Sequence, residues 1–325
     1  MRYSNDPTLS LFHHGSQLNP AQLIRLSQLA RHIPLKKQQR ILSSRAGNHV
    51  SRVKGRGLDY AENRQYLPGD DIRAMDWRVT ARTGSPHIKV YQEEKERPVL
   101  LVTDLRASMN FGSRRTLKQL LAADLTALLG WAAIAEGSRL GALLFNDNDE
   151  LDLRPKPGRR QQLHIINSLA TLYDTRPPGS HVPASASASP QQRITDMCLH
   201  LRRIAKPGSS IYFISDWHGM NADAEAQLFT LSRHCDLTAI QIYDPLEARL
   251  PASGWLTLTN GQRRDLINSS SQRQQHSHQQ RFEQQQQQLQ QHMLRLQMPL
   301  LTLSTADEPL PSLLAGLGLT RVTGG

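Results

Sequence analysis

Two aspartates and a serine in this chain have the chemistry of a cation site. The segment TDLRASMNFGS, residues 103–113, places Asp104 after an apolar run and Ser108 four residues later. The segment ISDWHG, residues 214–219, places Asp216 after a second apolar run. Mg²⁺ prefers carboxylate and hydroxyl oxygens and keeps some of its waters, which a partner's carboxylate can replace. The three side chains therefore predict a Mg²⁺ site.

One residue of the same segment opposes that prediction. Arg106 lies two residues after Asp104, and a guanidinium at the mouth of the site repels a divalent cation. Arg106 can instead fill the site by pairing with Asp104 or Asp216. The sequence leaves both outcomes open, a retained Mg²⁺ site and a site that has lost its metal.

A second candidate is the segment GRGLDYAENRQYLPGDDIRAMDWRVTARTG, residues 55–84, in which Arg alternates with Asp and Glu. Such a charge-balanced segment gains little on DNA, because its acids repel phosphate. Bidentate Arg–carboxylate pairs would fix a compact, turn-rich unit, with the aromatic residues as apolar anchors. We interpret the segment as a structural clamp whose exposed face also docks a partner. The predicted clamp and docking residues are Arg64, Tyr66, Asp70, Asp71, Arg73, Asp76, Trp77, Arg78 and Arg82, together with Arg106.

Apolar runs alternate with helical patterns from residue 98 onward. PVLLVTDL, residues 98–105, has the pattern of a buried strand, and a long helix is expected at about 114–136. This alternation predicts a doubly wound, mostly parallel α/β sheet with flanking helices, in which ligands bind at the carboxyl ends of the strands. Further strands are expected at 139–146, 209–217, 237–244 and 298–305, and further helices at 159–172, 189–205, 221–233 and 308–319.

The expected organisation has three parts. Residues 1–45 form an N-terminal helical segment, with a helix at 19–31 that begins with Asn and Pro. Residues 46–97 form a small, charged, β-rich flank. Residues 98–325 form the α/β domain, which includes a Gln-rich helix at 271–297.

Composition limits the compartment and the partners. The chain has no apolar run near the roughly 20 residues of a membrane helix and no signal-peptide pattern, which predicts a cytoplasmic protein without membrane insertion. The net charge of +11 suggests nucleic acid or an acidic partner, but the positive charges are scattered and aromatics are 5% of the chain. We therefore expect no specific nucleic acid. The sequence also lacks a nucleophile elbow, a phosphate loop and a His-Glu-x-x-His motif, which argues against an enzyme.

The succession of Gly-Arg-Gly, Tyr-x-Pro-Gly-Asp-Asp, Met-Asp-Trp and Ala-Arg within residues 55–82 resembles the bacterial family called domain of unknown function 58. The likeness is to its short cytoplasmic form and spans roughly residues 45–320. The resemblance implies a von Willebrand factor A-like core and a setting beside MoxR-type AAA+ ATPases. Members of the family are thought to act in the assembly or activation of other proteins.

Von Willebrand factor A domains carry a metal-dependent adhesion site, Asp-x-Ser-x-Ser plus a distant Thr and Asp, which Asp104, Ser108 and Asp216 resemble. Arg106 occupies the middle hydroxyl position, and Ser187 or Ser189 is the nearest candidate for the Thr. The resulting hypothesis is a non-enzymatic interaction module that works with a MoxR-type AAA+ ATPase in assembly, activation or stress-related maturation of other proteins. The alternatives are a metal-dependent hydrolase and a basic nucleic-acid-binding protein.

Overall fold

The chain divides into two compact units. Unit 1 comprises residues 1–50 and 98–325, and unit 2 comprises residues 51–97. The computed structural model describes residues 11–31, 33–35, 58–68, 70–93, 97–174, 189–252, 254–259 and 264–319.

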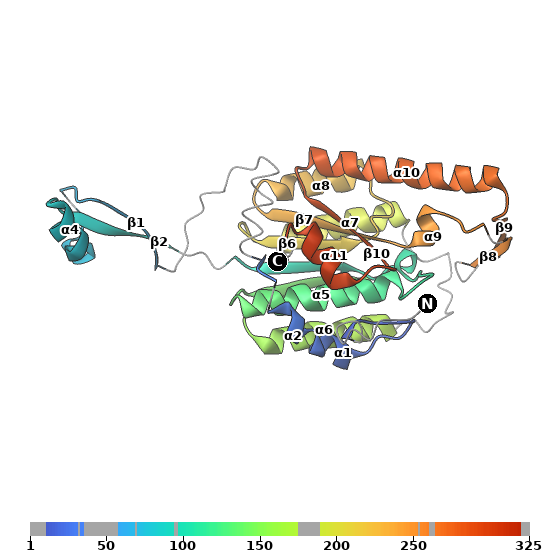
Figure 1. Cartoon of the computed structure of the whole chain (residues 1–325), viewed down its shortest axis with the longest axis horizontal. Coiled ribbons are helices and arrows are strands. Elements are labelled where there is room, and N and C mark those ends of the chain that lie inside the picture. Colours follow the sequence, from blue (N-terminus) through green and yellow to red (C-terminus); the bar gives the residue numbers. More distant parts are fainter. Residues whose placement is uncertain are drawn as a thin grey trace, which may run out of the picture. The chain divides into compact units, whose positions relative to one another are not determined.

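Unit 1 is built on a six-stranded sheet with the strand order β10-β7-β6-β3-β4-β5 (Figure 1). Five of its strands are parallel, and only the edge strand β5 runs antiparallel to its neighbour. The strands are β3 (Val99–Asp104), β4 (Leu140–Phe145), β5 (Glu150–Lys156), β6 (Ser210–Ser215), β7 (Asp236–Tyr243) and β10 (Leu300–Ser304).

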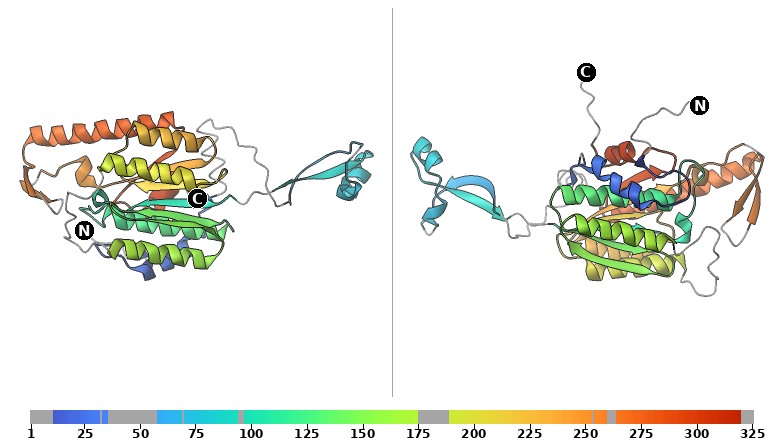
Figure 2. Two further views of the ribbon diagram at one scale, coloured as in Figure 1. Left: turned by 180° about the vertical axis from the view of Figure 1, so that it is seen from behind. Right: turned by 90° about the horizontal axis from the view of Figure 1, so that it is seen from below.

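Helices cover both faces of this sheet (Figure 2). Along β3, Val99 and Leu101 enter one hydrophobic cluster, and Leu100 and Val102 enter the other, because successive side chains of a strand point to opposite faces. The predicted fold class, a doubly wound and mostly parallel α/β sheet with flanking helices, is confirmed. On the first face lie α1 (Pro20–Arg25), α2 (Ser27–Ala30), α5 (Lys118–Ala135), α6 (Arg159–Asp174) and α11 (Pro309–Gly316); on the second lie α7 (Pro190–Ile204), α8 (Ala222–Ser232) and α10 (Gln272–Arg295).

The N-terminal helices belong to unit 1 and do not form a separate segment. Leu23 and Leu26 are fully buried in the cluster beneath α5, and Trp131 Nε1 donates a hydrogen bond of 2.9 Å to the carbonyl of Leu23. His13 Nδ1 lies 2.5 Å from an Asp124 carboxylate oxygen on α5. The sequence predicts the apolar stripe of residues 19–31, but the surface that this stripe covers is more than 80 residues away along the chain.

Several short elements differ from the sequence expectations. The strand β5 was not predicted, although Leu151 and Leu153 alternate with charged residues, because Pro155 interrupts the pattern. The hairpin of β8 (Trp255–Thr259) and β9 (Arg264–Asn268) was not predicted either, nor was the short helix α9 (Pro245–Ala248).

The helix α5 lies at the centre of the first face and is buried around almost its whole circumference. The two charged residues within it, Lys118 and Asp124, are both paired with groups from other elements. Among the described residues, none of the helices combines the length and the apolar character needed to cross a membrane.

Unit 2 is a hairpin with two short helices between its strands. The strand β1 (Leu58–Gln65) pairs antiparallel with β2 (His87–Glu93), and the connecting chain forms η2 (Ile72–Ala74) and α4 (Trp77–Thr83). The backbone N–H of Asp76 donates 2.8 Å to the carbonyl of His87, which ties the start of α4 to β2. The predicted β-rich flank is therefore a mixed α/β hairpin.

Candidate functional site

Asp104 and Asp216 lie at the carboxyl ends of β3 and β6, which are neighbours in the sheet. Both aspartates contact the same guanidinium, that of Arg106. Lys118 and Glu247 complete a group that we call the strand-edge cluster, defined as Asp104, Arg106, Lys118, Asp216 and Glu247.

The first half of the strand-edge cluster is the pair of Asp104 and Arg106. Arg106 donates from its backbone N–H, its Nε and its Nη2 to Asp104, with distances of 2.9, 3.0 and 2.7 Å. The hydroxyl of Ser215 donates a further hydrogen bond of 2.6 Å to Asp104. Asp104 is 0% exposed and Arg106 is 2% exposed, so the pair is closed to solvent.

The second half is organised around Asp216. Lys118 Nζ lies 3.0 Å from one carboxylate oxygen of Asp216 and 2.6 Å from Glu247 Oε1. The other oxygen of Asp216 accepts from the backbone N–H of His218 at 3.0 Å and lies 3.7 Å from Arg106 Nη2. The strand-edge cluster is thus a continuous network in which the two cations alternate with the three carboxylates.

Three groups of this network, Asp216, Lys118 and Arg106, have pKa values shifted toward their charged forms. Burial opposes the charge on Asp216, but Lys118 and Arg106 outweigh burial and lower the pKa of Asp216 to about 2. Burial also opposes the charge on Lys118, yet Asp216 and Glu247 raise the pKa of its ammonium above the ordinary value. For Arg106, Asp104 is the strongest of the charges that overcome burial and raise the guanidinium's pKa.

The residues present do not fit the Mg²⁺ of the sequence prediction. Two buried cations already neutralise two of the three carboxylates, and a divalent cation would have to displace the guanidinium of Arg106 from Asp104. The hydroxyl of Ser108 is buried and has no hydrogen-bond partner in the part of the chain that the structure describes, so one oxygen of the predicted set is unused. Within the described ranges there is no cluster of three or more His, Cys, Asp and Glu side chains that could hold a metal ion.

The two candidates for the distant hydroxyl give no support to a metal site. Ser189 uses its hydroxyl to cap α7, where it accepts from the backbone N–H of Gln192 at 3.1 Å. Ser187 lies outside the described residues.

Lys118 and Glu247 are the members that sequence reasoning missed. Lys118 is the first residue of a mostly apolar helix, so the sequence indicates that its ammonium pairs with a buried acid. The sequence does not indicate which acid this is. The partners of Lys118 lie 98 and 129 residues further along the chain, a distance that no local pattern spans. Arg106 was also predicted to dock a partner, but its burial leaves it no surface for docking.

In unit 2 one predicted clamp is present as a bidentate ion pair. Arg64 Nη1 and Nη2 lie 2.9 and 2.6 Å from the two carboxylate oxygens of Asp70. Asp70 also accepts from the backbone N–H of Leu67 at 2.8 Å, which closes the turn after β1. The hydrogen bonds from Arg64 are the main cause of a lowered pKa for Asp70.

Two further aspartates of unit 2, Asp71 and Asp76, accept hydrogen bonds from backbone N–H groups. Asp71 accepts from the N–H of Arg73 at 2.9 Å. Asp76 caps α4 by accepting from the N–H groups of Arg78 and Val79, at 3.1 and 3.2 Å. A carboxylate two residues before an arginine meets its backbone first, because the Asp side chain is short. No described residue forms an ion pair with the exposed side chains of Arg73, Arg78 and Arg82.

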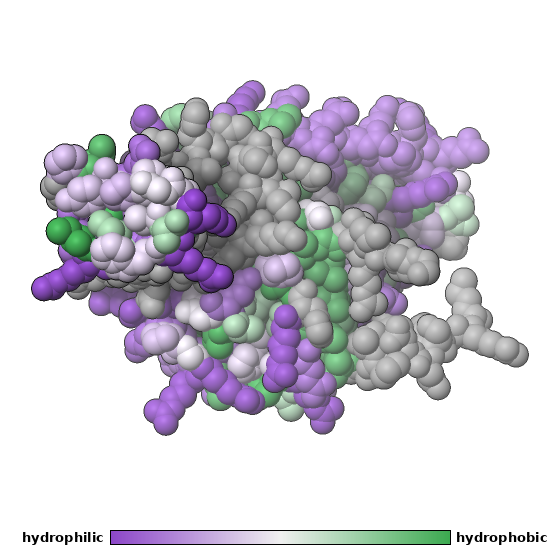
Figure 3. Space-filling view, turned by 60° about the vertical axis from the view of Figure 1, so that its left-hand side comes forward, coloured by the Kyte–Doolittle hydropathy of each residue, from purple (hydrophilic) through white to green (hydrophobic). Residues whose placement is uncertain are grey.

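The prediction that Trp77 anchors unit 2 is wrong. Trp77 is 68% exposed, because the cap at Asp76 turns the first residue of α4 outward, while Tyr66 is half-buried. Among the residues of this unit whose side chains are described, Ile88 on β2 is the buried apolar one. Leu67 and Ile72 are also exposed, at 59% and 61%. Figure 3 shows apolar surface on unit 2 beside strongly polar side chains.

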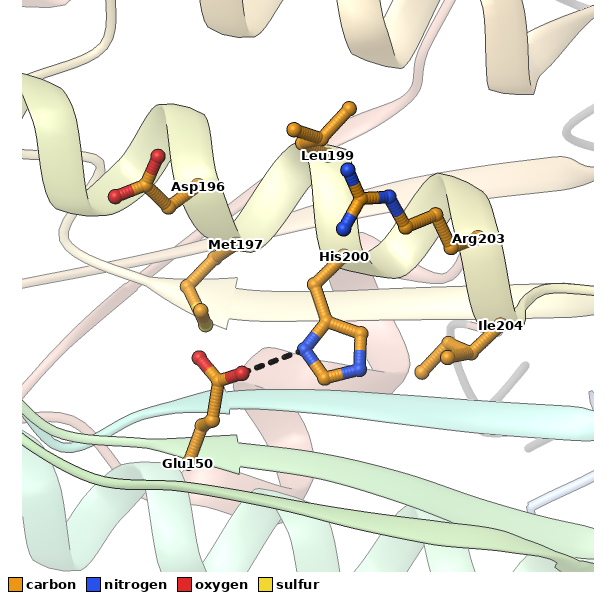
Figure 4. A pocket seen from close by; sticks show the side chains of 7 residues that line it. All are labelled: Glu150, Asp196, Met197, Leu199, His200, Arg203 and Ile204. Atoms are coloured by element: carbon orange, nitrogen blue, oxygen red, sulfur yellow. Dashed lines mark hydrogen bonds and ion pairs between the residues drawn. The ribbon is translucent and has the colours of Figure 1, made fainter.

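A shallow pocket of about 390 Å³ lies between β5 and α7 (Figure 4). His200 and Glu150 face each other across it, with Nδ1 2.8 Å from Oε1. Glu150 also pairs with Arg193 at 3.2 Å, so its carboxylate is already satisfied. None of the predicted site residues lines this pocket.

Comparison with known proteins gives one family and several relatives. A family model described as "Protein of unknown function DUF58" matches residues 62–292. The uncharacterized proteins Mb1516 of Mycobacterium bovis and Rv1480 of Mycobacterium tuberculosis are each 29% identical over 238 residues, which cover 73% of this chain and 71% of theirs.

Two solved structures are also similar. The conserved hypothetical protein BatB from Bacteroides thetaiotaomicron is 12% identical, with a TM-score of 0.40 over 68% of this chain and 95% of that one. An aerotolerance-related membrane protein from Bacteroides fragilis is 12% identical, with a TM-score of 0.41 over 69% of this chain and 100% of that one.

Proposed function

The chain belongs to the family described as protein of unknown function DUF58, and we propose that it is a non-enzymatic module that docks a protein partner through unit 2. The partner we propose is a MoxR-type AAA+ ATPase, with which the chain acts in assembly, activation or stress-related maturation of other proteins. The exposed Trp77, beside exposed arginines that form no ion pair with a described residue, is the observation that supports docking through unit 2.

The division of charge in unit 2 supports a docking face. The carboxylates of Asp70, Asp71 and Asp76 are all used within the unit, for one ion pair and for backbone caps. The guanidinium groups of Arg73 and Arg78 remain exposed in the described part of the chain. Exposed positive charge is therefore left for a partner, although the segment is nearly neutral in formal charge.

The apolar residues favour a protein over a nucleic acid as the occupant. Trp and Arg are the side chains most enriched at the energetic centres of protein interfaces. Leu67 and Ile72 are aliphatic, and such side chains add nothing to phosphate contacts. Three of the seven large, exposed apolar side chains among the described residues fall within 11 positions of unit 2, namely Leu67, Ile72 and Trp77.

The test measures binding of the purified ATPase from the same genome to the full chain by biolayer interferometry. We expect Trp77→Ala combined with Arg78→Glu to weaken binding by at least about tenfold, or about 1.4 kcal/mol. The matched control is Trp255→Ala on the hairpin β8–β9, which removes a tryptophan that is 65% exposed in unit 1. Its binding should equal that of the unmodified protein.

The outcomes separate the parts of the proposal. An unmodified chain that does not bind the ATPase rejects this partner. Binding that survives the unit 2 substitutions rejects the docking face. A salt-sensitive shift of DNA that depends on Arg73 and Arg78 would instead favour the basic nucleic-acid-binding alternative. Metal-dependent hydrolysis of a phosphodiester substrate that is lost in Asp104→Ala would favour the hydrolase.

A further inference from the structure

We propose that the guanidinium of Arg106 and the ammonium of Lys118 are permanent cations that stand where an adhesion-type site would hold a divalent metal. The chain would then keep the carboxylates of such a site at the carboxyl edge of its sheet while binding no metal there. This inference does not depend on docking through unit 2.

The contacts of Arg106 directly support the proposal that its guanidinium takes the place of a metal ion. A metal bound between β3 and β6 would need the free oxygens of Asp104 and Asp216. Both oxygens of Asp104 already accept from Arg106, and one of them also accepts from Ser215. Arg106 Nη2 reaches toward Asp216 as well, at 3.7 Å, so one guanidinium lies between the two carboxylates.

Lys118 supplies the second charge that a divalent cation would carry. Its Nζ takes the oxygen of Asp216 that faces away from Arg106, at 3.0 Å, and it continues to Glu247. Arg106 alone would leave the charge of one of the two buried aspartates uncompensated, and an unpaired buried charge is strongly destabilising. Two monovalent cations and one divalent cation satisfy the same pair of aspartates.

The hydroxyl of Ser108 provides independent evidence about the geometry. It lies at the second hydroxyl position of the Asp-x-Ser-x-Ser pattern, is buried, and has no hydrogen-bond partner among the described residues. Buried hydroxyls rarely remain unsatisfied. With the guanidinium of Arg106 on Asp104, the Ser108 hydroxyl takes no part in the strand-edge cluster.

A metal-bearing adhesion site offers its cation to a partner's carboxylate. Here Arg106 is 2% exposed and Lys118 is 1% exposed, so an incoming carboxylate cannot reach either charge. The strand-edge cluster therefore holds the loops after β3 and β6 together and does not bind acidic ligands.

The first arm of the test uses the unmodified full chain. MgCl₂ or MnCl₂ at up to about 10 mM, a range that covers weak protein sites, should change neither its melting temperature nor the heat measured by calorimetry. EDTA should likewise have no effect. Binding of Mn²⁺ to the unmodified chain that disappears in Asp104→Ala would overturn the proposal.

The second arm restores the Asp-x-Ser-x-Ser pattern with Arg106→Ser, alone and combined with Lys118→Gln. We expect the double variant to gain Mn²⁺ binding and a rise in melting temperature of about 2–4 °C with the metal. The matched control adds Asp104→Ala, which should abolish this gain. A folded double variant with no metal response would overturn the claim that the cations stand at the metal's position. If neither variant folds, the first arm still decides.

Discussion

The triplet of Asp, an apolar residue and Arg occurs once within a strand, at residues 152–154 of β5. At three further places it precedes or starts a short helix, at residues 104–106 in unit 1 and at residues 71–73 and 76–78 in unit 2. In all three, the backbone N–H of the arginine donates to the aspartate, at 2.9, 2.9 and 3.1 Å. The local hydrogen bond is thus identical. The fates of the three guanidinium groups differ, because only Arg106 turns back onto its own aspartate.

The middle residue explains the difference. Leu105 is buried in the main core of unit 1, and its neighbours Asp104 and Arg106 are buried with it. Burial of an unpaired guanidinium would cost a large amount of free energy, so Arg106 pairs with Asp104. Ile72 and Trp77 are exposed, so their neighbouring arginines remain hydrated and need no partner. The same short motif therefore forms a buried ion pair in unit 1. In unit 2 its aspartate caps a helix and its arginine side chain is exposed.

Removal of the arginine side chains should give the largest contrast between the two regions. Arg106→Ala leaves Asp104 buried without its partner, and we expect a loss of about 3–5 kcal/mol in the free energy of unfolding. Arg73→Ala and Arg78→Ala should each change that free energy by less than about 0.5 kcal/mol. Urea denaturation followed by circular dichroism measures all three. Equal losses of unfolding free energy in the three variants would show that burial of the arginine does not explain the difference between the triplets.

The dependence on pH should sharpen the contrast next. The pKa of Asp216 is lowered from 3.8 to about 2, so its stabilising effect is complete above about pH 4 and is lost as the pH falls through about 2. We expect the difference in unfolding free energy between the unmodified chain and Asp216→Asn to shrink by roughly 2 kcal/mol over this range. Urea denaturation at intervals between pH 5 and pH 2 would measure it. A difference in unfolding free energy that does not change with pH would contradict the lowered pKa of Asp216.

The smallest effect is expected from the cap in unit 2. Asp76→Ala removes the hydrogen bonds to the N–H groups of Arg78 and Val79 and should destabilise unit 2 by about 1 kcal/mol. Asp76→Asn keeps an acceptor oxygen and serves as the control. Hydrogen exchange at those two amides reports the change locally. Unchanged exchange together with lost partner binding would assign Asp76 to docking instead of to structure.

The sequence predicted the main sheet because its central strands are continuous apolar runs. β3 and β6 are buried along their full length, and this produces a signal that does not depend on distant residues. The start of α7 could also be predicted from the sequence, since Ser189 caps the helix and Pro190 is its first residue. β5 was missed because an edge strand is only half-buried and therefore has a weaker pattern.

The candidate site was only partly predictable. An aspartate at the end of a buried strand marked Asp104 and Asp216, and the strand order brings them to the same edge. The sequence also named Arg106 as a cation that can pair with these aspartates, and the structure shows this pairing. Lys118 was not predictable, because its place in the site depends on which distant basic residue the fold carries to that edge. The exposure of Trp77 was not predictable either. A tryptophan is usually expected to be buried, and the sequence does not show that the first residue after the Asp76 cap points to solvent.

The register of the hairpin in unit 2 pairs Leu58, the first residue of β1, with Glu93, the last residue of β2. The two ends of the described hairpin thus lie side by side. A segment whose ends meet in this way can be excised, duplicated or exchanged as a cassette. Unit 2 can consequently be replaced as a whole segment while the sheet of unit 1 keeps its own hydrogen bonds.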